Sequence, residues 1–108
     1  MGQNEYRSVV QPVLKWLNSL PGCKAINIHG SVYMERGTPD ILGCYQGRMF
    51  LFECKADQGT LRPDQILRMK QWHIAGAMVL EIRSLEQAKE AIRWLKEDIE
   101  IQSMGNNI

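Results

Sequence analysis

Two acidic residues and a lysine are spaced so that they could form one charged site. Asp40 stands near the start of an apolar run, 39–45, and Glu53 and Lys55 stand near the end of the next run, 48–56. Both runs are rich in apolar and aromatic residues, which is typical of β-strands. Acidic oxygens beside an ammonium group are suited to binding a cation together with an anionic substrate.

The turn between these runs predicts how the charged residues meet. Gln46 and Gly47 form a plausible two-residue hairpin turn. With this turn, Asp40 lies opposite Glu53, and their Cβ atoms are about 4.5–5.5 Å apart. Lys55 follows by two residues, so it projects from the same face of the sheet. Two facing carboxylates repel each other unless a cation lies between them, and Mg²⁺ or Mn²⁺ prefers such oxygen ligands. Phosphate is the obvious anionic substrate.

A second interpretation of the same residues stays open. Asp40, Glu53 and Lys55 could form an ion cluster on a partly solvated face, where the lysine neutralises the two carboxylates. This interpretation predicts an interaction or assembly protein that binds no metal.

The elements that must position these residues follow the order α-β-β-β-α-β-α. A first helix is capped by Asn4 and ended by Pro21-Gly22, and Pro12 should kink it or delay its start. Strands are expected over 23–29, 39–45, 48–56 and 77–82, a second helix begins at Pro63, and Ser84 caps the last helix. This order predicts an α/β fold with a central mixed sheet flanked by helices.

Composition indicates one globular domain over 1–108, with a core of about 4–99 and a tail of 100–108. The three cysteines are widely spaced, which favours reduced thiols and an intracellular, cytoplasmic location. The sequence has neither an apolar run long enough for a membrane span nor a signal-like start. With 13 basic and 12 acidic residues, net charge does not indicate a nucleic-acid partner. Function must therefore come from placed residues.

The motifs around the charged residues resemble a known family. Gly37-Thr38-Pro39-Asp40, Phe52-Glu53-Cys54-Lys55, Gly59 and Gln65 are similar to the G-x-P-D, E-x-K, G and Q pattern of the VRR-NUC branch of the PD-(D/E)xK nuclease superfamily. The resemblance covers roughly Glu5 to Ala91. The chain is most similar to stand-alone members of phage type.

The resemblance implies a restriction-endonuclease-like αβββαβα core, similar to that of Holliday-junction resolvases. It implies a Mg²⁺- or Mn²⁺-dependent DNA endonuclease that works as a homodimer. The implied substrate is branched or duplex DNA, such as four-way junctions or flaps, in replication, recombination or repair. The alternative is a catalytically weak nuclease-fold module that binds DNA, or an assembly protein.

The resemblance also implies residue roles. Asp40 and Glu53 would bind the metal, together with the backbone carbonyl of Cys54. Glu5 would complete the metal site or orient a bound water, so it counts as both a metal-site and a catalytic residue. The Cys54 side chain should face the core.

Lys55 would be the catalytic lysine, and Gln65 would position water or phosphate. Weaker candidates for DNA contacts, for which a solvated face is at least as expected, are Arg36, Arg62, Arg68, Lys70 and Ser31. His29 and His73 could be ligands, although a structural role is favoured for each.

Overall fold

The computed structural model describes residues 5–30, 34–56 and 58–105. The elements in chain order are η1 (Tyr6–Val10), α2 (Gln11–Leu17), β1 (Cys23–Asn27), β2 (Ile41–Tyr45), β3 (Arg48–Cys54), α3 (Pro63–Ile74), β4 (Met78–Ile82) and α4 (Leu85–Gly105). The predicted order of helices and strands is confirmed, as is the mixed sheet flanked by helices.

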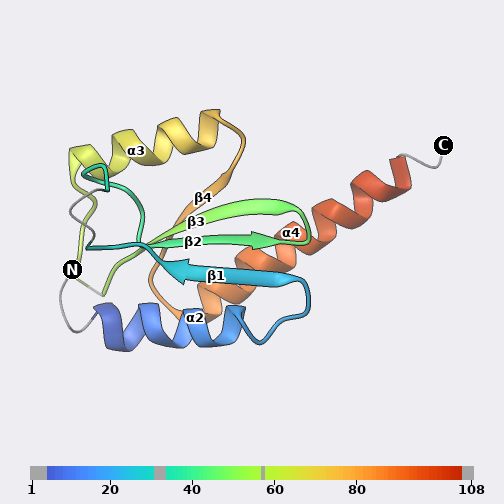
Figure 1. Ribbon diagram of the computed structural model, residues 1–108, viewed down its shortest axis with the longest axis horizontal. Coiled ribbons are helices and arrows are strands. Elements are labelled where there is room, and N and C mark those ends of the chain that lie inside the picture. The colour runs from blue at the N-terminus through green and yellow to red at the C-terminus, as the bar shows by residue number, and fades with distance from the viewer. Residues whose placement is uncertain (1–4, 31–33, 57, 106–108) are drawn as a thin grey trace.

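The four strands form one sheet in the order β1-β2-β3-β4. The first two pairings are antiparallel, and β3 pairs with β4 in parallel. Helices α2 and α4 cover one face of the sheet, and α3 lies over the other (Figure 1). The parallel pairing requires a crossover, which α3 supplies.

The β2–β3 hairpin has the predicted register. Gln46 and Gly47 both have positive φ, 47° and 87°, as a two-residue type I′ turn requires. Tyr45 pairs with Arg48, and the pairing continues in step along both strands. This register brings the start of β2 next to the end of β3.

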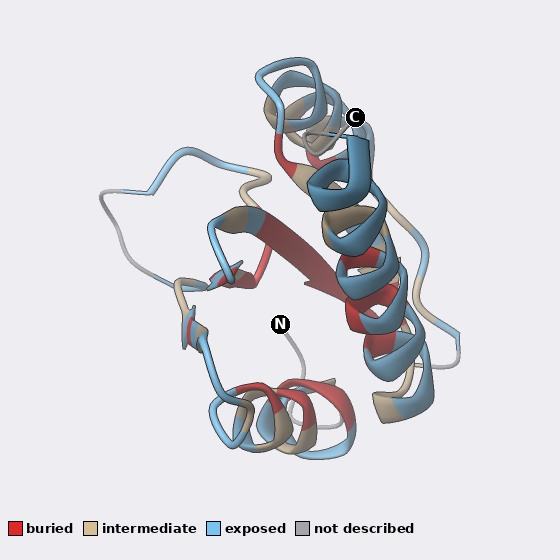
Figure 2. Ribbon diagram, turned by 90° about the vertical axis from the view of Figure 1, so that its right-hand side faces the viewer, coloured by how far each residue is buried: buried red, intermediate tan, exposed pale blue. Residues whose placement is uncertain are grey.

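The core lies between the sheet and the α2–α4 layer. Phe50, Phe52 and Cys54 alternate along β3 toward this layer and are fully buried. Their neighbours from the helices include Val13 of α2 and Ile92 of α4. Figure 2 shows that buried residues line the sheet-facing sides of both helices.

Pro12 is accommodated by a widened turn. The backbone N–H of Gln11 donates to the Tyr6 carbonyl, which is the i→i−5 spacing of a π-helix, and α2 then begins with Pro12 in its first turn. The missing N–H of proline is tolerated in a first turn, so the helix continues to Leu17. The predicted cap Asn4 lies outside the described residues.

The last helix is longer than the sequence pattern predicts. α4 runs to Gly105, although a tail is expected from residue 100, and residues 106–108 lie outside the described part. Between Leu85 and Gly105 the chain has neither proline nor glycine, so nothing in it stops the helix. No helix in the described part of the chain is both long and apolar enough to span a membrane.

Gly37 yields a prediction about how the loop before Asp40 is fixed. Its φ is +87°, and a Cβ added there would lie 2.5 Å from the carbonyl oxygen of Asp64 in the first turn of α3. We expect Gly37→Ala to destabilise the fold by about 2 kcal/mol more than Gly76→Ala, since overpacking is added to backbone strain. Gly76 has a φ of +111° but open space around it, so it isolates the strain. Urea unfolding of both variants measures the difference, and equal losses would contradict it.

Candidate active site

Three charged residues are buried at one end of the sheet. Asp40 immediately precedes β2, Glu53 is the last residue but one of β3, and Lys55 follows β3. Their exposed fractions are 1%, 2% and 7%. Asp, Glu and Lys are almost never fully buried unless paired, so each must be offset by specific partners.

Asp40 is held by contacts from two strands. Its Oδ2 accepts a hydrogen bond of 2.9 Å from the backbone N–H of Cys54. Its Oδ1 lies 2.7 Å from Nδ1 of His29. The backbone carbonyl of Asp40 accepts from the N–H of Ile28 at 2.8 Å, which extends the contact between β1 and β2. The carboxylate is therefore fixed before any ligand arrives.

Glu53 lies between its carboxylate neighbour and two groups that favour its charge. Gln65 Nε2 donates to Glu53 Oε1 at 3.2 Å, and Lys55 Nζ is 3.9 Å from the same oxygen. Burial, together with the neighbouring Asp40, raises the pKa of Glu53 to about 9, although Lys55 lowers it in part. Without a cation, burial and the facing Asp40 therefore favour the protonated form of Glu53.

Two oxygens of this pair fit a divalent cation. Glu53 Oε2 is buried and accepts no hydrogen bond from the described residues, and the buried Asp40 Oδ1 has the His29 ring beside it at 2.7 Å. Buried oxygens without such partners are costly, and hard cations bind oxygens of this kind. No third Asp, Glu, His or Cys of the described ranges joins them in a metal-binding group. Two carboxylates completed by waters and phosphate are a usual set for Mg²⁺.

Cys54 and Glu5 stand at the edge of this pair. The Cys54 side chain is fully buried in the core, as predicted. Burial raises the pKa of its thiol, and nearby carboxylates, including Glu5, raise it further, so a thiolate ligand is disfavoured. Glu5 Oε1 lies 3.3 Å from the position of a Cβ built on Gly59, which places it beside the loop after Lys55. Glu5 thus borders the site without forming a three-acid cluster among the described residues.

Gln65 is the buried polar residue of α3. It occupies the third position of the helix and is 4% exposed. Its Oε1 accepts a 2.9 Å hydrogen bond from the backbone N–H of Arg62, while its Nε2 donates to Glu53. The capping contact fixes the amide, so Gln65 orients Glu53 from the start of α3.

Arginines form a rim next to the start of α3. Arg62 and Arg36 both pair with Asp64, each at 3.1 Å, and their side chains are 52% and 80% exposed. Arg62 also lies near enough to Glu53 to lower its pKa slightly. Arg68 instead pairs with Glu35 and so holds the loop that precedes β2. The predicted candidate Ser31 lies outside the described residues.

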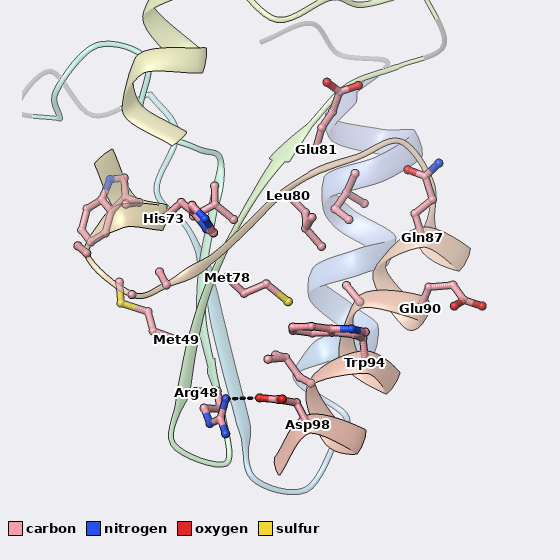
Figure 3. Close-up of a pocket in the computed structure, with 18 of the residues that line it drawn as sticks. Arg48, Met49, His73, Met78, Leu80, Glu81, Gln87, Glu90, Trp94 and Asp98 are labelled. Atoms are coloured by element: carbon pink, nitrogen blue, oxygen red, sulfur yellow. Dashed lines mark hydrogen bonds and ion pairs between the residues drawn. The ribbon is translucent and has the colours of Figure 1, made fainter. Parts of the chain in front are cut away.

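A groove elsewhere in the molecule is lined mainly by apolar residues. Its volume is about 1040 Å³, and its lining includes Met78 and Leu80 of β4 and Trp94 of α4. Arg48 and Asp98 form an ion pair at one end of it, as Figure 3 shows. The groove contains none of the buried charged residues, so it is separate from the candidate active site.

Comparison with known proteins supports the fold. No protein-family model and no curated protein matches the sequence. A solved structure described as "VRR_NUC domain" matches with a TM-score of 0.68 and 21% sequence identity, covering 85% of this chain and 97% of that chain. The chain therefore has the nuclease-type α/β fold of a VRR_NUC domain. The resemblance that the motifs indicate is confirmed at the level of the fold.

Two contacts near the site are not predicted by the sequence. His29 is named there as a possible ligand with a structural role favoured, and the structure places its Nδ1 beside Asp40. The pairing of Asn27 with Ile41 places the end of β1 beside Asp40, so extending that register would reveal the contact. Arg83 contacts the loop after Lys55 from beyond β4, and no local motif signals such a contact.

The His29 contact predicts an effect on metal binding. Groups that orient a metal ligand typically change metal affinity by about 10- to 100-fold when removed. We expect His29→Ala to weaken Mn²⁺ binding by about 10-fold. His29→Asn should lose much less, because its amide nitrogen can replace Nδ1. Calorimetric titration with Mn²⁺ measures both, and equal affinities for the wild type and the alanine variant would show that His29 does not orient Asp40.

The raised pKa of Glu53 predicts a pH-dependent stability. In the unfolded chain this carboxyl has its ordinary pKa of 4.5, and in the folded chain the pKa is about 9. The folded protein binds this proton more tightly than the unfolded chain does. The resulting stabilisation of the fold is complete below pH 4.5 and is lost as the pH rises toward 9. In EDTA, the wild type should lose up to about 1.4 kcal/mol per pH unit between pH 5 and 8.

Glu53→Gln keeps the hydrogen-bonding shape and removes this titration. The free energy of unfolding of Glu53→Gln should therefore increase relative to that of the wild type as the pH rises from 5 to 8. Urea unfolding in EDTA measures both values. Glu100→Gln makes the same substitution at an exposed position and serves as the control. Parallel pH profiles for the wild type and Glu53→Gln would rule out the effect.

Proposed function

We propose that this protein is a Mg²⁺- or Mn²⁺-dependent DNA endonuclease that hydrolyses phosphodiester bonds. The observation that carries the proposal is the buried Asp40–Glu53 pair, in which Glu53 Oε2 accepts no hydrogen bond from the described residues and Lys55 lies beside it. The pair occurs in a chain with the fold of a VRR_NUC domain. A purely structural sheet would gain nothing from burying two carboxyl groups face to face, because their desolvation is costly.

A cation bound by Asp40 and Glu53 would lower the pKa of a water molecule and neutralise charge on a phosphoryl group. Lys55 would place its ammonium group next to that phosphate, stabilising the charge of the transition state or holding the attacking water. Gln65 fixes the orientation of Glu53 through its amide. The backbone carbonyl of Cys54 and the Glu5 carboxylate are proposed to complete the site, Glu5 through a water molecule.

The rim of arginines supports a phosphate-bearing polymer as the substrate. Arg36 and Arg62 are largely exposed and are held at the start of α3 by Asp64. Arginine guanidinium groups of this kind bind backbone phosphates independently of base sequence. A net charge of +1 makes this local concentration of positive charge important for DNA affinity.

The finer part of the proposal is selectivity for branched DNA by a homodimer. Exposed apolar side chains support a second copy: Leu80 on the edge strand β4, and Trp94, Ile101 and Met104 on α4. A two-fold dimer would present two sites to two strands. Roles in DNA replication, recombination or repair, an intracellular location and a phage origin are predictions from the resemblance and the composition.

A panel of labelled DNA structures tests the function. The wild type with Mn²⁺ should cut four-way junctions or flaps faster than linear duplex, and EDTA should abolish cutting. Asp40→Asn should lose both Mn²⁺ binding and cleavage, whereas Lys55→Ala should bind Mn²⁺ and cut at least about 100-fold more slowly. Sedimentation in the same buffer measures whether the active species is a dimer.

The exposed Arg93→Ala, which removes only a pairing with Glu90 within α4, is the matched control and should cut normally. Salt-sensitive DNA binding without any cleavage would favour the binding module instead. Full cleavage by Lys55→Ala would show that Lys55 has no role in the cleavage mechanism.

A further inference from the structure

Arg83 joins the end of β4 to the loop that follows the buried lysine. Its Nε donates to Glu81 Oε1 at 2.5 Å. Its Nη1 donates to the carbonyl of Ala56 at 2.9 Å, and its Nη2 donates to the carbonyl of Gly59 at 2.5 Å. One guanidinium group therefore binds a carboxylate and two backbone carbonyls from a distant segment.

The loop held in this way forms a wall of the candidate active site. The N–H of Gly59 donates to the Ala56 carbonyl at 2.9 Å, which closes the turn. A Cβ built on Gly59 would lie 3.2 Å from Lys55 Cδ and 3.3 Å from Glu5 Oε1. Gly59 thus packs against the stem of the lysine and against the acidic residue that borders the site.

The contacts of Lys55 explain why such a wall matters. Its backbone N–H is fixed by the carbonyl of Ile82 at 3.0 Å. Its Nζ, in contrast, is 3.9 Å from Glu53 Oε1, which is too long for a hydrogen bond. A flexible four-carbon stem held at one end needs packing along its length to place the ammonium group.

We propose that Arg83 is a positioning residue that acts through Ala56 and Gly59 to hold Lys55 in place. The inference rests on the proposed nuclease function for its catalytic consequence, but the contact between Arg83 and the turn does not depend on it. Arginine is suited to the task because its planar fork has five donors, whereas lysine has a single charged centre. Glu81, which pairs in register with Glu53 on the neighbouring strand, orients the guanidinium group of Arg83.

The first test measures the position of Lys55 without using activity. Lys55 is 7% exposed in the folded protein, so an amine-reactive acetylating reagent should modify it slowly. Arg83→Ala should raise the modification rate of Lys55, read by peptide mass mapping, relative to the exposed Lys96 in the same molecule. Arg48→Ala removes an ion pair at the opposite end of the sheet and should leave the ratio unchanged.

The second test measures cleavage in a single turnover at saturating DNA. Arg83→Ala should slow cleavage by about 10- to 100-fold while Mn²⁺ and DNA affinities stay within about two-fold of wild type, because Asp40 and Glu53 have their own contacts. Gly59→Ala disturbs the wall on the lysine side and leaves Arg83 intact, so it should also slow cleavage. Arg83→Lys preserves a charge for Glu81 but cannot bind both carbonyls, and it should give an intermediate rate.

The outcomes separate the two proposals. Unchanged modification of Lys55 in both Arg83 variants would overturn the positioning role, whatever the cleavage rates. Increased modification together with a wild type that cuts no DNA would uphold the link between Arg83 and Lys55 and overturn the nuclease proposal. If Arg83→Ala does not fold, Arg83→Lys and Gly59→Ala provide the same comparisons.

Discussion

Asp40 and Glu53 face each other in a buried position because the β2–β3 hairpin fixes the register of the strands that carry them. The contacts around the pair reduce the cost of this arrangement. The N–H of Cys54 and the ring of His29 approach Asp40, while Gln65 and Lys55 approach Glu53. These contacts come from several separate parts of the chain, so the fold as a whole positions the pair.

At this end of the sheet, one face packs into the apolar core and the other carries the charged residues. Along β3, Phe52 and Cys54 point into the apolar core, while Glu53 between them points to the α3 side. Burial of the apolar core on the α2–α4 side stabilises the sheet, so it can tolerate an unfavourable carboxylate pair on its other face. A cation would convert that unfavourable pair into a binding site.

The sequence is most informative where the physical rules are local. The turn at Gln46-Gly47 has an intrinsic preference and a fixed length, so it predicts both the strands and the facing of Asp40 and Glu53. The contacts of His29 with Asp40 and of Arg83 with the loop after Lys55 are not predicted, because they depend on how distant segments pack. The extension of α4 to Gly105 escapes it because the end of that helix carries exposed apolar residues that give no clear periodic face.

The widened turn at Tyr6–Val10 has a consequence for how this chain tolerates change. A π turn holds one residue more than an α turn, so it accommodates an additional residue between Glu5 and the residues of α2 without turning them about the helix axis. Val13 and Leu17 can therefore keep their places in the core while Glu5, upstream, faces the loop beside Lys55. Deleting one residue from this turn would restore an ordinary α turn, so Glu5 would keep its direction toward the loop beside Lys55 while Val13 and Leu17 stay in the core. A change of one residue in chain length is thus absorbed between the acidic residue and the core.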